Sequence, residues 1–443
     1  MTIYALSTGS GISGIAVIRV SGENAAEVVK RITGSNLPSP RVATLKKFNK
    51  NGKKNLIDEG VLIWFPGPNS YTGEDLAEFH IHGSTSVVNA MHVAISKIKN
   101  CRLAEPGEFT KRAFQNGKIN LLKAESIGDL IASETEIQRK QALKIMGGHS
   151  SDKFNSWRKK LLKILSYIEA KIDFPDEDLP KSIIKETQKI SSDVLVEIKK
   201  TLNDEKVGER IREGFKIAIV GPPNSGKSSL LNYLSKREAS IVSEIAGTTR
   251  DVIEIHLNLD GYPVILSDTA GIRKSKNEIE KKGIKVALKR AIDADLRLVI
   301  VSTKNVDFTG VFRDLLTKNS ILVVNKSDLL KGKLNSKLKR KQHVLISIKK
   351  DLNLNKLLNK IKSKLKNKFL SSKDILITRE RHRQNLIDCV HHLEKFKKKK
   401  SSKDFDKGAE DLRLATRHLG MIVGEVGVEE LLGSIFSDFC IGK

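Results

Sequence analysis

The stretch Gly221-Pro-Pro-Asn-Ser-Gly-Lys-Ser228 has the spacing GxxxxGK[ST]. The apolar run 215–220 (Phe-Lys-Ile-Ala-Ile-Val) before it predicts a buried strand, and the segment 229–234 (Ser-Leu-Leu-Asn-Tyr-Leu) after it predicts the first turns of a helix. Glycines let backbone amides turn toward phosphate oxygens, the lysine supplies positive charge, and the final hydroxyl can ligate Mg²⁺. Because the neighbouring segments fit as well as the motif itself, we interpret this stretch as the phosphate-binding loop of an α/β nucleotide domain.

Three later segments complete a nucleotide site in chain order. The strand-like Leu266-Ser-Asp268 ends in a carboxylate that can hold Mg²⁺ through water, and Gly271 offers a backbone amide to a terminal phosphate. Asp328, in Asn-Lys-Ser-Asp, can accept hydrogen bonds from the N1–H and exocyclic amine of guanine, which adenine does not offer in that pattern. The segment 347–349 (Ser-Ile-Lys) lies where GTPases place a loop over the guanine. These segments predict GTP as the nucleotide rather than ATP.

The predicted GTP contacts fall into four parts of the chain. They are Asn224, Ser225, Gly226, Lys227, Ser228 and Ser229; Ser243, Glu244, Ile245, Ala246, Gly247, Thr248 and Thr249; Asp268, Thr269, Ala270 and Gly271; and Asn325, Lys326, Asp328, Ser347, Ile348 and Lys349. We expect Mg²⁺ to bind the hydroxyls of Ser228 and Thr249.

The group that orients the hydrolytic water is not the usual one. Ile272 follows Gly271 at the position where Ras-type switches carry a glutamine, and an isoleucine cannot orient water. Asn224, inside the phosphate loop, offers an oxygen ligand that can hold a monovalent cation against the bridging phosphate oxygens. The expected K⁺ ligands are Asn224, Ser243, Ile245 and Thr248. The alternative is that Asn224 is an ordinary turn residue.

Five segments spread over the chain carry a resemblance to a known family. They are 14–22 (Gly-Ile-Ala-Val-Ile-Arg-Val-Ser-Gly), 68–75 (Pro-Asn-Ser-Tyr-Thr-Gly-Glu-Asp), 78–83 (Glu-Phe-His-Ile-His-Gly), 104–114 (Ala-Glu-Pro-Gly-Glu-Phe-Thr-Lys-Arg-Ala-Phe) and 439–443 (Phe-Cys-Ile-Gly-Lys). With these segments the chain resembles, from end to end, the tRNA-modifying GTPase family called MnmE or TrmE.

The resemblance implies a potassium-activated GTPase whose G domains dimerise. It implies that Glu280 is the catalytic glutamate and acts beside Lys227 of the phosphate loop. Without the resemblance, Glu280 is one more charge on a solvated helix that also carries Glu278, Lys281 and Lys282.

The resemblance also implies a second site, in the amino-terminal domain, for a tetrahydrofolate derivative of the 5,10-methylene or 5-formyl type. Arg19, Glu78, Lys118 and Lys443 match the family's folate-contacting positions. A pterin edge presents a guanine-like pattern that the Glu78 carboxylate can read, and the cations suit its carbonyl and glutamate tail. The alternative is that these residues are ordinary surface charges. His80 and His82 point to one face of a strand and are expected to pack at its rim rather than bind a metal.

The carboxyl-terminal segment contains a candidate catalytic thiol. Cys440 precedes Gly442 and Lys443, so the thiol can lie behind a folate whose site the last residues reach. Attack of this thiol on a uridine ring is one interpretation; a buried thiol that packs as a small hydrophobe is the other.

The distribution of strand-like runs and helical periodicity along the chain predicts a multidomain α/β plus α fold. Residues 1–117 show an α+β pattern, and the resemblance implies that they form a folate-binding-type dimerisation domain. Residues 118–210 are predicted to form the first part of a helical domain, 211–368 a Ras-like P-loop GTPase, and 369–443 the second helical part. The stripe Phe154, Trp157, Leu161, Ile164, Ile168 and Ile172 recurs at helical spacing and predicts a bundle core. The GTPase is therefore expected to be inserted into a helical domain built from both flanks.

Composition restricts the compartment and the partners. The three cysteines are far apart, which argues against a disulfide framework and fits a reducing cytoplasm. No apolar run is long enough to span a bilayer, so no membrane association is expected. The formal charge of +27 favours polyanions such as tRNA, although a general lysine bias would produce the same number.

The sequence thus predicts a GTPase that acts in tRNA modification. The resemblance implies a homodimer that forms a heterotetramer with a flavin-dependent partner of the MnmG type and adds an aminomethyl or carboxymethylaminomethyl group at C5 of the wobble uridine of certain tRNAs. The alternative is a ribosome-assembly GTPase that binds rRNA as a switch. The folate-type amino-terminal half and the segment 439–443 argue against that alternative.

Overall fold

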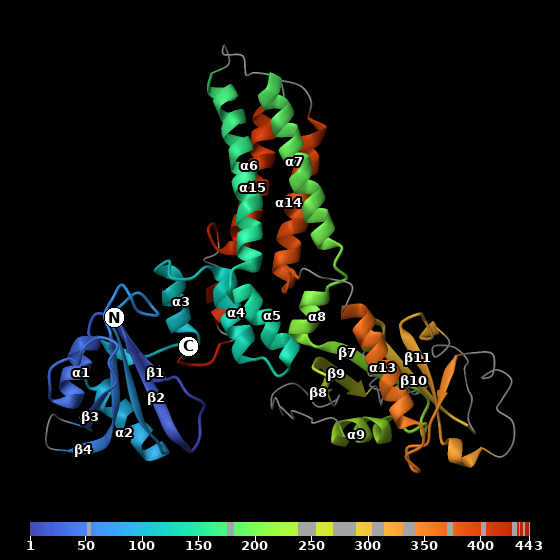
Figure 1. Cartoon of the computed structure of the whole chain (residues 1–443), viewed down its shortest axis with the longest axis horizontal. Helices are drawn as coiled ribbons and strands as arrows, with labels where there is room; N and C mark the ends of the chain where they lie inside the picture. Colours follow the sequence, from blue (N-terminus) through green and yellow to red (C-terminus); the bar gives the residue numbers. More distant parts are fainter. Residues whose placement is uncertain are drawn as a thin grey trace, which may run out of the picture. The chain divides into compact units, whose positions relative to one another are not determined.

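The computed structural model describes residues 1–50, 55–174, 181–237, 254–268, 289–303, 314–330, 342–369, 375–399, 405–427, 432–433, 435–436 and 439–442. The chain divides into two compact units (Figure 1): Met1–Gly128 with Ile145–Leu195 and Asn385–Lys443, and Asp129–Lys144 with Val196–Gln384. The predicted domain boundaries at residues 117, 210 and 368 stay predictions. Within the described part of the chain, no helix is long and apolar enough to cross a membrane.

The amino-terminal domain contains a six-stranded sheet of order β3-β4-β5-β2-β1-β6. Only the β1–β6 pair is parallel. Its elements are β1 (Thr2–Leu6), β2 (Ser13–Ser21), α1 (Ala25–Thr33), β3 (Thr44–Asn49), β4 (Leu56–Phe65), β5 (Leu76–Gly83), α2 (Thr85–Ser96), β6 (Cys101–Leu103) and α3 (Glu108–Gln115).

Side-chain alternation gives this sheet two different faces. Ile18 and Val20 of β2 lie in one hydrophobic core with Val28 of α1 and Met91 of α2, so both helices cover the same face. Arg19, between them in β2, therefore points to the opposite face. That face has its own smaller core, which includes Phe109 of α3. The α+β character predicted for this domain is confirmed.

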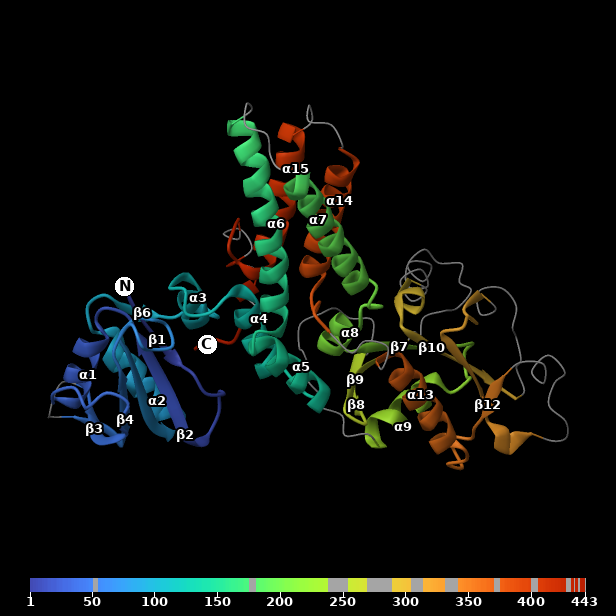
Figure 2. The same cartoon turned by 45° about the horizontal axis from the view of Figure 1, so that its top comes forward.

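Helices that precede and follow the GTPase segment in the sequence form a bundle. Figures 1 and 2 show α6 (His149–Asp173), α7 (Lys181–Leu202), α14 (Glu380–Lys398) and α15 (Phe405–Val423) side by side. The predicted apolar stripe of α6 is buried from Phe154 to Ile168, and the rings of Phe154 and Trp157 lie 5.7 Å apart. Helix α6 packs along α15, although the GTPase segment separates them in sequence. The predicted insertion into a helical domain is confirmed.

Shorter helices flank this bundle in the sequence. They are α4 (Leu121–Ile131), α5 (Glu136–Met146) and α8 (Val207–Glu213). Phe439, near the carboxyl terminus, packs against Leu121 and Ala124 of α4 in a small hydrophobic core with Phe436. The last described residues are therefore held by the chain that immediately follows the amino-terminal domain.

The nucleotide domain contains a second six-stranded sheet, of order β12-β11-β10-β7-β9-β8, in which only β8 is antiparallel. One face carries α9 and α13, and the other has a separate core with Ala291, Ala294 and Leu315. This P-loop α/β fold was predicted. Its elements are β7 (Phe215–Val220), α9 (Lys227–Arg237), β8 (Glu254–Leu259), β9 (Tyr262–Asp268), β10 (Leu296–Ser302), β11 (Ser320–Asn325), β12 (His343–Leu345) and α13 (Leu354–Phe369).

Candidate functional site

The phosphate-loop motif lies at the carboxyl end of β7, and α9 begins at its lysine. The backbone of Asn224 has φ 60° and that of Gly226 has φ 104°, which a glycine adopts without strain. A Cβ on Gly226 would lie 2.1 Å from Asn325 Nδ2, so close approach also requires glycine here. Lys227 Nζ donates to the carbonyls of Gly221 and Pro222, both at 3.1 Å, and thus points back across the loop.

The loop contains a buried hydroxyl whose hydrogen-bonding capacity is unmet within the described part of the chain. The Ser225 side chain is 1% exposed, and its Oγ has no hydrogen-bond partner among the described residues. A buried hydroxyl without a partner is costly, and a ligand oxygen at the loop would satisfy it. This orphaned hydroxyl and the neighbouring backbone amides fit a bound phosphate. Ser228 lies one residue into α9, where its hydroxyl suits Mg²⁺, so the residues present fit both groups.

A second segment, at the end of β11, is tied to the phosphate loop. Asn325 Nδ2 donates to the Ser225 carbonyl at 2.9 Å, and Asn325 Oδ1 accepts from the Ile348 amide at 3.3 Å. Asn325 is 3% exposed, so these contacts satisfy a buried amide. One side chain therefore connects the phosphate loop with the loop after β12, as a site that spans a whole nucleotide requires.

A cavity of about 310 Å³ opens beside these contacts. Asp328 and the loop 347–349 line it together with Asn325, Lys326 and Gly226. Ser347 Oγ donates to Asp328 Oδ1 at 2.5 Å, which fixes the carboxylate in place. The structure thus brings together the two segments that were predicted to surround the guanine.

The environment of Asp328 keeps it ionised. The hydrogen bond from Ser347 is the main cause that lowers the pKa of Asp328 below its ordinary value of 3.8, and the charges of Lys349 and Lys350 add to it. An ionised carboxylate accepts hydrogen bonds and donates none, which suits the two donors on the guanine edge. At neutral pH the site therefore has the acceptor pattern for guanine.

Several predicted residues of this site lie outside the described part of the chain. Asp268 ends β9, and its backbone is in register with Ile219 of β7. The predicted contacts that are not described are Ser243, Glu244, Ile245, Ala246, Gly247, Thr248, Thr249, Thr269, Ala270, Gly271 and Glu280. Their roles, and those of Mg²⁺ and K⁺ at them, stay predictions.

The second predicted site is centred on Arg19, on the face of the amino-terminal sheet that α1 and α2 do not cover. Arg19 Nε and Nη2 donate to Glu78 Oε1 at 3.0 and 2.8 Å, and the pair is largely shielded from solvent. The guanidinium carbon lies 5.5 Å from the centroid of the Tyr71 ring and 5.7 Å from that of Phe109. One carboxylate and two aromatic rings thus fix the position of this cation.

Sequence reasoning missed Tyr71 and Phe109 as members of this site. Both lie in segments that were singled out only as family signatures, 68–75 and 104–114. Their spacing from Arg19 gives no sign of contact, since the segments meet only when α3 packs on the sheet. The hydroxyls of Tyr71 and Thr110 lie 2.8 Å apart and join the two segments.

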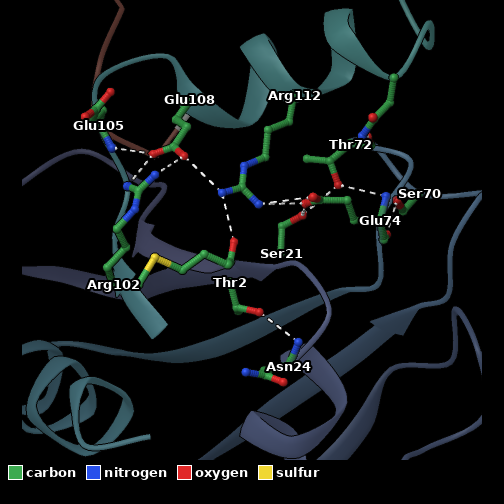
Figure 3. A network of polar contacts seen from close by, with 12 residues as sticks. Thr2, Ser21, Asn24, Ser70, Thr72, Glu74, Arg102, Glu105, Glu108 and Arg112 are labelled. Atoms are coloured by element: carbon green, nitrogen blue, oxygen red, sulfur yellow. Dashed lines mark hydrogen bonds and ion pairs between the residues drawn. The ribbon is translucent and has the colours of Figure 1, made fainter. Parts of the chain in front are cut away.

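A network of charges fixes the same two segments to the strands (Figure 3). Glu108 accepts from Arg102 at 2.6 and 2.8 Å and from Arg112 at 3.0 Å. Arg112 also donates to both oxygens of Glu74 at 3.1 Å, and Ser21 Oγ donates to Glu74 at 2.7 Å. The loop that carries Tyr71 is therefore held from both sides. Nearby, Lys118 Nζ donates to the Pro68 carbonyl at 2.8 Å at the start of this loop.

The carboxyl-terminal segment reaches this site. Ile441 forms a bridge with Pro106, and the Gly442 carbonyl accepts from Ser7 Oγ at 2.8 Å and from Arg19 at 3.5 Å. Gly442 has φ 96°, and a Cβ there would lie 2.2 Å from the Leu6 carbonyl oxygen. The structure thus brings Arg19, Glu78 and this segment together; Lys443 lies outside the described residues.

Cys440 differs from one of its two interpretations, and each of the two histidines lies near a carboxylate. Cys440 is exposed, so the interpretation of a buried, packing thiol is wrong. His82 is exposed and its Nδ1 lies 2.8 Å from Asp58, while His80 Nε2 lies 3.6 Å from Glu78. In the part of the chain that the structure describes, no cluster of residues is suited to hold a metal ion.

A doubly wound α/β domain with this phosphate loop and this carboxylate-lined guanine cavity defines a P-loop GTPase. Comparison with known proteins agrees and is more specific. A family model described as the GTP-binding protein TrmE N-terminus matches residues 2–118, and one described as the MnmE helical domain matches residues 121–440.

Whole-chain relatives extend this result. The tRNA modification GTPase MnmE of Pelagibacter ubique is 69% identical over 443 residues, which is all of both chains. Proteins of the same description from Rickettsia bellii and Parvibaculum lavamentivorans are each 44% identical, over 450 and 443 residues, and also cover both chains fully. This chain therefore belongs to the MnmE family of tRNA modification GTPases.

Proposed function

We propose that this chain hydrolyses GTP and, with a flavin-dependent MnmG-type partner, takes part in adding an aminomethyl or carboxymethylaminomethyl group at C5 of the wobble uridine of certain tRNAs in the cytoplasm. The observation that carries the proposal is the presence of two built sites in one chain. One is the guanine cavity at Asp328, and the other is the Arg19–Glu78 site with the carboxyl-terminal segment over it. A ribosome-assembly switch needs only the first.

In the GTP site we assign roles that the contacts of the described residues support. Asp328 reads the guanine, Asn325 keeps the base loop and the phosphate loop in register, and Lys227 turns from the loop carbonyls to the phosphates when they bind. Bound Mg²⁺ supplies charge neutralisation at the phosphates. Asn224 is the residue we assign to K⁺, and Glu280 the one we assign to orientation of the water; both assignments remain proposals.

In the amino-terminal site we propose a tetrahydrofolate derivative as the one-carbon donor. The Tyr71 ring beside the Arg19 guanidinium supplies a flat surface for a pterin, and Glu78 supplies an acceptor for the pterin's amino edge. The Phe109 ring is buried and supports the guanidinium rather than the pterin. Lys118 and Lys443 are the cations we assign to its carboxylates. Dimerisation through this domain and a heterotetramer with the partner complete the proposal. Hydrolysis of GTP then drives domain movement and does not itself modify the base.

The proposal is tested by mass spectrometry of wobble-uridine nucleosides in cells that lack this protein. Unmodified uridine should accumulate, and the wild-type gene should restore the modified nucleoside. The exposed Cys440 is tested in the same cells with Cys440→Ser, which should fail to restore it if the thiol acts on the uridine. Wobble uridines that stay fully modified without the protein would contradict the proposed function.

A matched pair of variants tests the contact between the carboxyl-terminal segment and the Arg19 site. Gly442→Ala places a Cβ against the Leu6 carbonyl at a strained φ, so the segment should leave the Arg19 site and modification should fall severalfold. Gly433→Ala meets no atom within 4 Å and should modify tRNA like the wild type. GTP hydrolysis by both proteins reports that the nucleotide domain is folded. Equal tRNA modification by the two variants would mean that the carboxyl-terminal segment is not part of the proposed site.

A further inference from the structure

A second cavity lies in the amino-terminal domain, on the face of the sheet that α1 and α2 cover. It has a volume of about 340 Å³ and lies where α1 and α2 end, beside the residue that follows β3. Its buried floor consists of Ile32, Ala94 and Ile98. Arg19 points to the other face of the sheet, so this cavity is separate from the site proposed for folate.

The rim of this cavity carries four cations: Lys30 and Arg31 from the last turn of α1, Lys50 after β3, and Lys97 at the end of α2. Arg31 pairs with Glu27 at 2.7 Å. Lys30, Lys50 and Lys97 have no ion-pair partner among the described residues, and none of the residues that line the cavity is acidic. Three long, exposed cations therefore converge over a small apolar floor.

The two helix ends oppose this charge only in part. Each carboxyl-terminal helix end contributes roughly half a negative charge, so α1 and α2 together contribute about one. The four rim cations less Glu27 leave a formal charge of three. The positive potential at the rim therefore exceeds the opposing helix-end charge, and the cavity attracts an anion. Three mobile ammonium groups suit phosphate oxygens, which they bind as point charges without demanding a fixed geometry.

We propose that this cavity, which we call the basic cavity, receives a backbone phosphate of the tRNA. The inference rests on the proposed function, because the chain's partner there is a tRNA. Lysine contacts to phosphates position a nucleic acid without reading its bases. The basic cavity thus helps to position the tRNA backbone, with residues that belong to neither the guanine cavity nor the Arg19 site.

The test compares two double variants of the full-length protein. Lys30→Gln/Lys97→Gln removes two cations of the basic cavity, leaves a polar side chain at each position and keeps helix propensity. Lys185→Gln/Lys189→Gln removes the same charge from exposed positions on α7 and is the control. Binding of an unmodified tRNA transcript with a wobble uridine is measured by filter binding from 50 to 200 mM KCl without nucleotide. Thermal unfolding and GTP hydrolysis check that every protein is folded.

The cavity variant should bind the tRNA about tenfold more weakly at low salt, and the slope of log K against log salt should become shallower by about one for each lysine. The control pair should bind nearly as the wild type does. Equal weakening by both pairs would show that the charge acts diffusely and would overturn the proposal, as would unchanged binding by the cavity variant. A wild-type protein that does not bind tRNA would instead contradict the proposed function.

Discussion

At the scale of single residues, we expect Asp328 to decide the choice of nucleotide. An Asp328→Asn variant presents an amide donor to the guanine amine, so GTP affinity should fall by about ten- to a hundredfold, as for a lost charge-assisted hydrogen bond. Xanthosine triphosphate, which has an oxygen in place of that amine, should bind the variant better than the wild type does. Fluorescence titration with both nucleotides measures this exchange. GTP binding that is unaffected by the substitution would contradict the assignment.

The pH dependence of nucleotide choice follows from the same residue. The hydrogen bond from the Ser347 hydroxyl lowers the pKa of Asp328 below 3.8, the ordinary value for an aspartate. The carboxylate therefore becomes protonated only at a pH below 3.8. Removing that hydrogen bond with Ser347→Ala should raise the pH at which GTP affinity declines. Titration of both proteins between pH 3.5 and 6 measures the shift. Coincident curves would mean that Ser347 does not support the carboxylate.

Asn224 is the residue on which the potassium proposal depends. Its left-handed backbone places it in the phosphate loop next to the buried Ser225. Asn224→Ala should abolish the faster hydrolysis that we expect in K⁺ relative to Na⁺ at equal ionic strength, because an oxygen ligand of the cation is lost. Steady-state GTPase rates in the two salts measure it. A wild-type rate that is the same in both salts would exclude a catalytic K⁺.

At the scale of elements, the sequence predicts best where a pattern is local. The strand 215–220 is predicted residue for residue because an apolar run before a phosphate loop has one structural meaning. The buried stripe of α6 follows from helical spacing for the same reason. The site around Arg19 could be predicted only through resemblance. Its aromatic rings, Tyr71 and Phe109, come from a loop and from α3, and no local sequence pattern predicts that they lie close together.

The network that holds these two elements together should make the amino-terminal domain sensitive to acid. Burial raises the pKa of Glu108, but hydrogen bonds from Arg102, the Glu105 amide and Arg112 outweigh it and leave the pKa below its ordinary value of 4.5. Ionised Glu108 therefore stabilises the folded domain above about pH 4.5, and this contribution is lost as the pH falls through the lowered value.

A substitution separates this contribution from general acid effects. Glu108→Gln should destabilise the domain by about 2 kcal/mol at pH 7, and the difference from wild type should shrink as the pH drops below about 4.5. Hydrogen exchange of the amides in β1, β6 and α3 measures it. Glu27→Gln, which breaks an exposed pair with Arg31, is the control and should leave this exchange unchanged. A Glu108 effect no larger than that of the control would contradict the prediction.

At the scale of the whole molecule, the formal charge of +27 predicts a salt-dependent association with tRNA. If six to ten phosphates are neutralised, affinity should fall by about 10³ to 10⁵ between 50 and 200 mM salt. Filter binding over this range measures the slope for the wild-type protein. A nearly flat dependence would mean that the excess of lysine reflects composition and not RNA binding. Charge alone does not distinguish these two origins, which is why the sequence left both open.

The contact between Ser7 and Gly442 joins residues 435 positions apart in sequence. During synthesis the amino-terminal strands leave the ribosome first, yet the site around Arg19 lacks these backbone contacts until the segment that carries Gly442 has been synthesised. A polypeptide that lacks residues 441 and 442 would therefore lose the bridge to Pro106 and the contacts to Ser7 and Arg19. Assembly of the Arg19 site thus depends on two parts of the chain that are synthesised at widely separated times.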